Sequence, residues 1–228
     1  MLISNWMTKD PISVLPSTPL SKCQKLMKLR GIHRLPVVDD DNKVVGIVSD
    51  RDVKSNLPSK ATTLSVHELQ YLLAEIQTKQ IMTPSPVTVR ETETVSKAAL
   101  LMLDGKFGGL PVVDDDGHLT GIITDQDVFR VFATLAGARV PGIELTLEVS
   151  TGEGALKSVF EVLRQQGARV VSLMTQFGEG ETREVFIRLQ RPESVAQATA
   201  IRAALSEQWK LLASIPPLVP LYPSVLNF

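Results

Sequence analysis

The sequence predicts a mixed α/β (α+β) fold: a pseudo-symmetric pair of small domains followed by a third domain of a different kind. The first observation is an internal repeat, in which Met7-Thr8 returns as Met82-Thr83, a shift of 75 residues. The second is that both copies read strand, helix, strand, strand, helix. The third is a run of glycine and proline over residues 137–142, after which the pattern changes.

The repeat keeps turn-forming and polar residues in place as well as apolar ones. Leu-Pro-Val-Val-Asp-Asp-Asp occupies residues 35–41 and again 110–116, and the segment 46–53 returns as 121–128. Retained Gly, Pro, Asp and Ser/Thr specify backbone turns and polar contacts along with a core. Two such units in tandem predict a pair with pseudo-twofold symmetry and a shared interface.

Hydrophobic spacing indicates the elements of each copy. A short strand, 12–14 or 87–89, leads into a helix that we expect to end at Gly31 or Gly105 in a left-handed conformation. The Leu-Pro-Val-Val run is a buried strand, the aspartates with Asn42 or Gly117 form a hairpin turn, and a second helix starts near Ser49 or Thr124. The apolar face of the first helix comprises Leu20, Cys23, Leu26 and Met27 in one copy and Val95, Ala98, Leu101 and Met102 in the other.

Four segments are expected. Residues 1–57 form the first repeat, 58–79 a linker with an amphipathic helix at 64–76, 80–136 the second repeat, and 142–228 the third domain. The third domain reads as strand 143–149, helix 154–166, strands 169–175 and 184–189, helix 193–208 and a strand near 209–213. This βαββαβ order is ferredoxin-like. The apolar tail from residue 215 carries four prolines, and we expect it to pack on its own surface or on a partner subunit.

The repeats, over roughly residues 1–135, closely resemble tandem CBS domains, the pair called a Bateman module. The third domain resembles an ACT domain, with residues 151–156 standing where that family has its glycine-containing loop. A CBS pair followed by an ACT-like domain is similar to proteins of the acetoin-utilisation AcuB type. The resemblance implies a non-catalytic regulatory sensor that binds an adenine nucleotide (AMP, ADP or ATP) in the clefts of the pair.

A Ser/Thr-x-x-Asp pattern opens the second helix of each copy, as Ser49 with Asp52 and as Thr124 with Asp127. The pattern is a capping box, which needs no ligand. A helix start also offers free N–H groups to an anion, and a carboxylate suits a pair of ribose hydroxyls. The resemblance implies ribose on Asp52 or Asp127 and phosphate near Ser49 or Thr124.

The two copies differ in the cationic residues that would bind a phosphate group. His33-Arg34 aligns with Gly108-Gly109, and Arg51 aligns with Gln126, so we expect unequal sites. We assign Arg34, and with it His33 and Arg51, to the phosphates; ordinary surface contacts are the alternative. Apolar residues beside the clefts would sandwich a purine or simply belong to the core: Ile12, Leu35 and Pro36, with Val87, Leu110 and Pro111.

Other chemistry is less well supported. Asp39 to Asp41 and Asp114 to Asp116 offer oxygen ligands for Mg²⁺ or Ca²⁺, but adjacent aspartates in a turn point apart, so no metal site is expected. Cys23 takes a core-facing position, and no catalytic fingerprint is present, so we expect no enzyme. Gly152 and Gly154 suit either a small carboxylated ligand such as an amino acid or a tight turn.

Composition limits the functional class. The chain has 228 residues, 43% of them hydrophobic, and a formal net charge of -1, which predicts a soluble globular protein with no nucleic-acid partner. No apolar run approaches the ~20 residues of a membrane span, and the first residues are unlike a signal peptide. With a single cysteine, these features favour the cytoplasm.

Two other functions stay open. One is a constitutive dimerisation scaffold with vestigial clefts, and the other is an amino-acid sensor acting through the ACT-like domain. A homodimer is expected in each case, with a regulated enzyme as a candidate partner. AMP, ATP, S-adenosylmethionine and dinucleotides all present a ribose and an adenine face, so the sequence does not choose among them.

Overall fold

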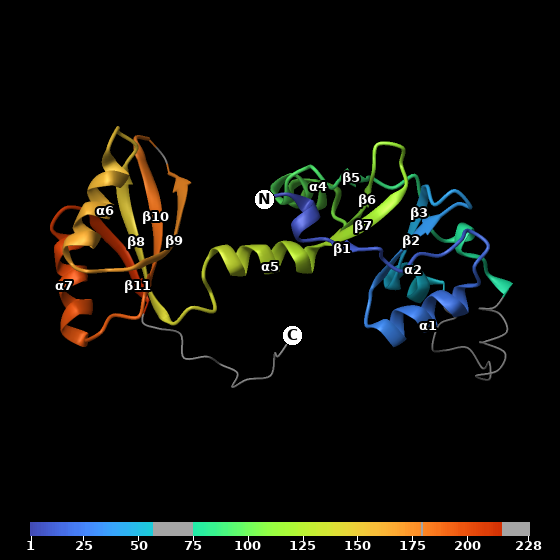
Figure 1. Cartoon of the computed structure of the whole chain (residues 1–228), viewed down its shortest axis with the longest axis horizontal. Coiled ribbons are helices and arrows are strands. Elements are labelled where there is room, and N and C mark those ends of the chain that lie inside the picture. Colours follow the sequence, from blue (N-terminus) through green and yellow to red (C-terminus); the bar gives the residue numbers. More distant parts are fainter. Residues whose placement is uncertain (57–74, 179, 216–228) are drawn as a thin grey trace. The chain divides into compact units, whose positions relative to one another are not determined.

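The computed structural model describes residues 1–56, 75–178 and 180–215 (Figure 1). The chain divides into two compact units, unit 1 from Met1 to Phe129 and unit 2 from Arg130 onward. The predicted linker helix at 64–76, except for its last two residues, and the predicted tail beyond residue 215 lie outside the described residues. In the parts that are described, no helix has the length and apolar character that crossing a membrane requires.

The first repeat folds as its pattern predicts. Helix α1 buries Leu20, Cys23 and Met27 and ends at Gly31, whose φ of 63° is left-handed. The aspartate turn forms because Oδ1 of Asp39 accepts hydrogen bonds from the backbone N–H groups two and four residues later. The elements are α1 (Leu20–Arg30), β2 (Arg34–Val38), β3 (Val44–Ser49) and α2 (Asp50–Ser55).

The second repeat has the same order, but the end of its first helix differs from expectation. The prediction that Gly105 ends its first helix in a left-handed conformation is wrong, because the helix includes Gly105 and Lys106 takes the positive φ of 54°. A Cβ at Gly105 would collide with the ring of Phe107, so the glycine provides space for that ring. The elements are β5 (Val89–Arg90), α4 (Val95–Gly105), β6 (Gly109–Val113), β7 (Leu119–Thr124) and α5 (Asp125–Leu135).

The predicted leading strands at 12–14 and 87–89 are shorter than expected. Only Val14 of the first forms a bridge, parallel to Val37, and β5 begins at Val89, where it pairs in parallel with Val112 of β6. In this leading segment, only one residue pairs with β2 in the first repeat, and only two residues pair with β6 in the second.

Two further short strands are exchanged between the repeats. Strand β1 (Thr8–Lys9) belongs to the first repeat yet pairs antiparallel with β7 of the second, with Thr8 opposite Ile122. Strand β4 (Thr83–Pro84) is its equivalent and pairs with β3 of the first repeat, with Thr83 opposite Ile47. The resulting sheets have the orders β1-β7-β6-β5 and β2-β3-β4. Each repeat therefore completes the sheet of the other.

Glycine at residues 46 and 121 makes this exchange possible. A Cβ at Gly121 would lie 2.5 Å from Sδ of Met7 and 3.1 Å from the carbonyl oxygen of Thr8. A Cβ at Gly46 would collide with Met82 in the equivalent way. The repeated methionine and the repeated glycine are thus contact partners across the two copies.

Backbone hydrogen bonds also connect the two copies, at the segments that precede α1 and α4. The N–H of Ile3 donates to the carbonyl oxygen of Glu93 at 2.9 Å, and the equivalent N–H of Thr78 donates to that of Thr18 at 2.9 Å. The donors lie in two short 3₁₀ helices, Ile3–Asn5 and Thr78–Gln80. Unit 1 is therefore a single compact body in which neither repeat is complete alone.

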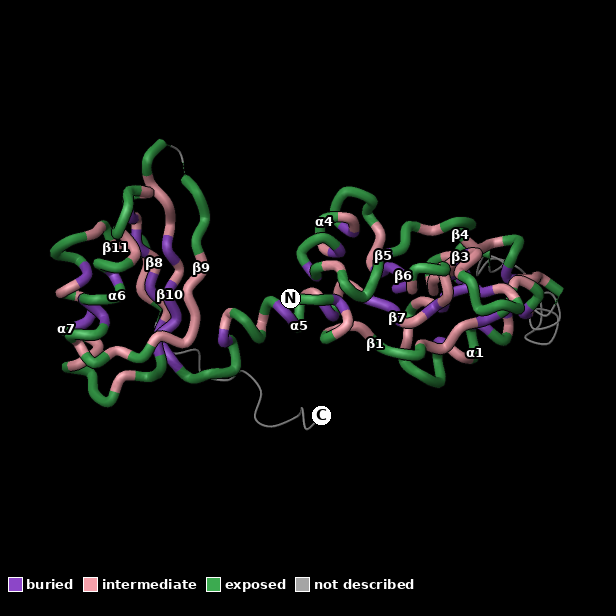
Figure 2. The backbone as a smooth tube through the Cα atoms, turned by 45° about the horizontal axis from the view of Figure 1, so that its top comes forward, coloured by how far each residue is buried: buried purple, intermediate pink, exposed green. Residues whose placement is uncertain are grey.

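Beyond the end of α5, the described part of unit 2 is one antiparallel sheet with α6 and α7 on one face (Figure 1). The strand order is β11-β8-β10-β9, and Figure 2 shows the buried residues following β8 and β10 at its centre. Arg188 of β10 is buried among them, where it donates to the carbonyl oxygen of Val140 and pairs with Glu144. The elements are β8 (Gly142–Ser150), α6 (Ala155–Gln165), β9 (Val170–Phe177), β10 (Thr182–Gln190), α7 (Val195–Ser206) and β11 (Lys210–Ile215).

The close contact between β1 and Gly121 of β7 predicts that a side chain at Gly121 destabilises unit 1. We expect Gly121→Ala to lower the free energy of unfolding of unit 1 by about 1–3 kcal/mol, because the added methyl group overpacks against Met7 and Thr8. The two tryptophans are Trp6 and Trp209, so urea unfolding followed by fluorescence in a Trp209→Phe background reports on unit 1.

The matched control is the double variant Gly121→Ala with Met7→Ala, which removes the sulfur from the contact. Its stability should exceed the value expected from adding the two single effects. Strict additivity of the two substitutions would contradict the contact between the copies.

Candidate functional site

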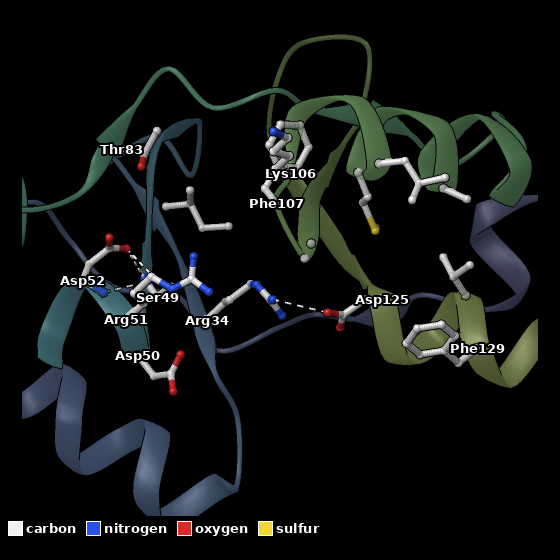
Figure 3. Close-up of a pocket in the computed structure, with 17 residues that line it drawn as sticks. Arg34, Ser49, Asp50, Arg51, Asp52, Thr83, Lys106, Phe107, Asp125 and Phe129 are labelled. Carbon is white, nitrogen blue, oxygen red and sulfur yellow. Dashed lines mark hydrogen bonds and ion pairs between the residues drawn. The ribbon is translucent and has the colours of Figure 1, made fainter. Parts of the chain in front are cut away.

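A cavity of about 700 Å³ lies between the two repeats, and all its lining residues belong to unit 1. Its size is within the ~300–1,000 Å³ typical of small-molecule sites. The two sides differ in character (Figure 3). One side carries Arg34, Ile47, Ser49, Asp50, Arg51, Asp52 and Thr83. The other carries Ala99, Met102, Leu103, Lys106, Phe107, Gly108, Gly109, Asp125, Val128 and Phe129.

The polar side is built on the end of β3 and the start of α2. Oδ2 of Asp52 accepts hydrogen bonds from the N–H and the hydroxyl of Ser49, each at 2.7 Å, and the N–H of Asp52 donates to Oγ of Ser49 at 3.3 Å. The predicted capping box is therefore present. Within the described residues Oδ1 of Asp52 accepts no hydrogen bond, and Asp52 lines the cavity, so this oxygen is available to a ligand.

The second Ser/Thr-x-x-Asp pattern has the same internal geometry but a different exposure. Oδ2 of Asp127 accepts from the N–H and the hydroxyl of Thr124 at 2.8 and 2.7 Å. Asp127 is only 3% exposed, and neither residue lines the cavity. The two copies of the pattern are thus alike as helix caps and unlike as candidate ligand contacts.

Arg34 reaches from the first repeat across the cavity to the second. Its Nη2 lies 3.7 Å from Oδ2 of Asp125, at the start of α5 (Figure 3). A Cβ at Gly108 would collide with this guanidinium group, and one at Gly109 would lie 3.1 Å from Cδ of Arg34. The glycines that align with His33 and Arg34 therefore make room for Arg34 itself.

The remaining charges of the cavity are arranged unequally. Lys54 donates to Asp50 at 2.8 Å, and this hydrogen bond, with His33 at 3.6 Å, holds the pKa of Asp50 below its usual value. Across the described part of the chain, Arg51 and Lys106 have no carboxylate within 4 Å. His33 contacts Asp50 but does not line the cavity.

The apolar wall of the cavity comes from α4 and α5, where the sequence did not predict ligand contacts. Leu103 and Phe129 stay 75% and 68% exposed, and Met102 and Phe107 lie beside them. One signal was available in the repeat, because the first copy has Lys28 where the second has Leu103 and Lys54 where it has Phe129. Large apolar side chains thus replace the solvated lysines of the first copy.

The residues predicted to sandwich a purine do not line this cavity. Four of them belong to the core, as the alternative expectation had it. These four, Leu35, Pro36, Leu110 and Pro111, are buried in β2 and β6. Ile12 packs against the core of the first repeat, and Val87 is 46% exposed.

In unit 2, the loop over residues 151–154 turns into α6. Gly154 has a φ of 78°, and a Cβ there would meet nothing within 4 Å, so the left-handed backbone is what favours glycine. A Cβ at Gly152 would meet only the side chain of Ser150, at 3.5 Å. These features fit the tight-turn alternative.

The aspartate triplets and Cys23 have local structural partners. Asp114, Asp116 and His118 gather within 4.8 Å, and hydrogen bonds from His118 lower the pKa of Asp114 as they close the turn. Cys23 is buried against the hydroxyl of Thr78 at 3.2 Å, and burial raises the pKa of its thiol. A thiol with a raised pKa is a poor nucleophile.

Comparison with known proteins gives relatives for unit 1. The chloroplastic CBS domain-containing protein CBSX2 of Arabidopsis thaliana is 37% identical in an alignment of 134 residues, and the match covers 51% of this chain and 56% of that protein. The chain thus spans little more than half the length of this relative.

Two solved structures are similar at 28% identity. One is an acetoin utilization protein (AcuB) from Vibrio cholerae, with a TM-score of 0.51 over 61% of this chain and 95% of that one. The other is the CBS domain pair of protein MJ0100 in complex with 5′-methylthioadenosine and S-adenosyl-L-methionine, with a TM-score of 0.50 over 59% and 97%.

The family model for the CBS domain matches residues 3–59 and again 78–134. These two segments make up half of the chain and coincide with the two copies of the internal repeat, each including the short strand that it lends to the other. The protein therefore belongs to the CBS domain family and carries a tandem CBS pair.

Proposed function

We propose that this protein is a non-catalytic regulatory sensor that binds an adenine nucleotide, of the AMP, ADP or ATP class, in the cavity between its two CBS domains. The observation that carries the proposal is the division of the cavity into a polar wall with a free carboxylate oxygen and two arginines, and an apolar wall with two phenylalanines. A nucleotide has the same division, between ribose phosphate and base.

The wall residues support one orientation of the ligand. Oδ1 of Asp52 accepts from the ribose hydroxyls, because a carboxylate is a pure acceptor. Arg34 and Arg51 meet the phosphate through charge-assisted hydrogen bonds. The base lies against Phe107 and Phe129, where aromatic faces favour stacking. The adenosine ligands of the MJ0100 CBS pair support the choice of an adenosine compound.

The cavity charges favour a nucleotide with few phosphates. Three cations, Arg34, Arg51 and Lys106, share the lining with three carboxylates, Asp50, Asp52 and Asp125. The formal charges of the wall therefore cancel, and each added phosphate group meets no further cation. We accordingly take AMP as the first probe and ATP as its comparison.

We also propose a homodimer that uses the outer face of α4. Leu100, which does not line the cavity, is 58% exposed there, while the first copy has Lys25 at the equivalent position. The repeat thus supplies an internal comparison with a solvated helix of the same fold. Apolar residues at such positions favour burial against another surface, for which we take a second copy of the chain.

The ferredoxin-like, ACT-like nature of unit 2 is likewise a proposal. The element order and the strand order β11-β8-β10-β9, antiparallel throughout, support it. In this proposal unit 2 or a regulated enzyme partner responds to the ligand state of unit 1, since a ligand shifts only an equilibrium between states that it binds unequally. The cytoplasmic location stays a prediction.

The proposed ribose contact predicts a selective loss of binding. We expect Asp52→Ala to weaken AMP binding about 10- to 100-fold in calorimetric titration, because it removes the charged acceptor of the ribose hydroxyls. Asp127→Ala is the matched control, since it removes the same capping interaction from the second repeat but lies outside the cavity.

Both variants should lose about 1 kcal/mol of stability from the lost cap. Equal weakening of AMP binding by the two substitutions would show that helix capping, and not the cavity, is responsible. If the unmodified protein binds none of AMP, ADP, ATP and S-adenosylmethionine, the result would refute the nucleotide sensor and favour the constitutive scaffold.

The proposed dimer predicts the effect of placing at Leu100 the lysine that the first copy has at the equivalent position, Lys25. We expect Leu100→Lys to shift the protein toward the monomer in light scattering after size-exclusion chromatography, because it places a charge in the apolar contact. Leu29→Lys is the control, since Leu29 on α1 is 69% exposed and lies in the other repeat. A monomeric unmodified protein, or equal effects of both substitutions, would refute the proposed interface.

A further inference from the structure

The only ion pair that spans the cavity, among the residues that the structure describes, joins Arg34 of β2 to Asp125 of α5. Nη2 and Oδ2 are 3.7 Å apart, and the two side chains are 22% and 45% exposed. Figure 3 shows the two side chains pointing toward one another across the open space between the repeats. The pair therefore occupies part of the volume that a ligand would enter.

The pair depends on a difference between the two copies. The second repeat has Gly108 and Gly109 at the places of His33 and Arg34, and a side chain at Gly108 would collide with both Arg34 and Asp125. The absence of two side chains thus creates the space in which Arg34 meets Asp125.

The equivalent carboxylate of the first repeat has different partners. Asp50 aligns with Asp125 and also lines the cavity, but it accepts from Lys54 at 2.8 Å and lies 3.6 Å from His33. Two carboxylates at the same position of the repeat therefore face the same cavity, and only Asp125 is paired with Arg34.

We propose that Asp125 is an internal competitor for Arg34, so that an anionic ligand must displace this carboxylate to reach the guanidinium group. The inference rests on the proposed nucleotide site and adds a residue that determines its specificity. A phosphate carries about -1.5 to -2 charges and offers several acceptor oxygens, whereas the ion pair at 3.7 Å is longer than a charge-assisted hydrogen bond. Phosphate therefore replaces Asp125 as the partner of Arg34, and the ion pair across the cavity breaks as the ligand binds.

Two consequences follow for ligand choice. Asp125 lowers the affinity for every anionic ligand, because part of the binding free energy is used to separate the existing pair. It leaves a neutral ligand such as adenosine largely unaffected, since that ligand has no group that needs Arg34. The ratio of AMP to adenosine affinity is thus the quantity that Asp125 controls.

The experiment is calorimetric titration of the full chain and its Asp125→Asn variant with AMP and with adenosine. We expect Asp125→Asn to bind AMP about three- to tenfold more tightly and to change adenosine affinity less than twofold. In an Arg34→Gln background the AMP gain from Asp125→Asn should disappear, because no guanidinium group remains to be released.

Asp50→Asn is the matched control, because it removes one negative charge from the lining of the same cavity, at the equivalent position of the repeat, without freeing Arg34. A gain in AMP affinity as large as that of Asp125→Asn, or a gain that persists in the Arg34→Gln background, would overturn the proposal in favour of a general field effect. AMP binding that Asp125→Asn leaves unchanged would also overturn it while the proposed function stands. Absence of binding by either ligand to every variant would refute the proposed function itself, and this inference with it.

Discussion

The exchange of two short strands between the repeats is the interaction on which the rest of unit 1 depends. Because β4 pairs with β3, Thr83 lies opposite Ile47, and because β2 pairs with β3, Arg34 lies opposite Ser49. These four residues all line the cavity. Ser49 ends β3 and caps α2, so the residues through Asp52 follow directly from the end of the same strand. Sheet register alone therefore assembles the polar wall from segments that are far apart in the chain.

The second determinant is the departure from symmetry. A pair of identical copies would present two equal clefts, each with the same side chains. Here Arg34 faces a glycine at its own equivalent position, and Lys54 is replaced by Phe129. Most of the polar residues consequently lie on one side of the cavity, and most of the apolar ones lie on the other, beside Lys106 and Asp125. A ligand with one charged and one flat apolar end fits such a space in a single orientation, which gives a pseudo-symmetric fold a directional site.

Most of the fold could be predicted because its signals are local. The buried strands, the aspartate turns, the αL residue Gly31 and the capping box at Ser49 each depend on a few neighbouring residues. Strands β1 and β4 could not, because two residues carry no periodicity and a repeat does not reveal which copy its edge strand joins. The same limit applies to the site. Ser49, Asp52, Arg34 and Arg51 were found from pattern and charge, but Asp125 and Phe107 take their places only through contacts between the copies.

The proposed function requires that one nucleotide binds between the polar and apolar walls of this cavity. A crystal structure of the full chain grown with AMP tests it most directly. We expect density for one nucleotide per chain, with its ribose at Asp52, its phosphate at Arg34 and Arg51, and its base against Phe107 and Phe129. Density at Thr124 and Asp127, density confined to unit 2, or an empty cavity at saturating AMP would contradict it.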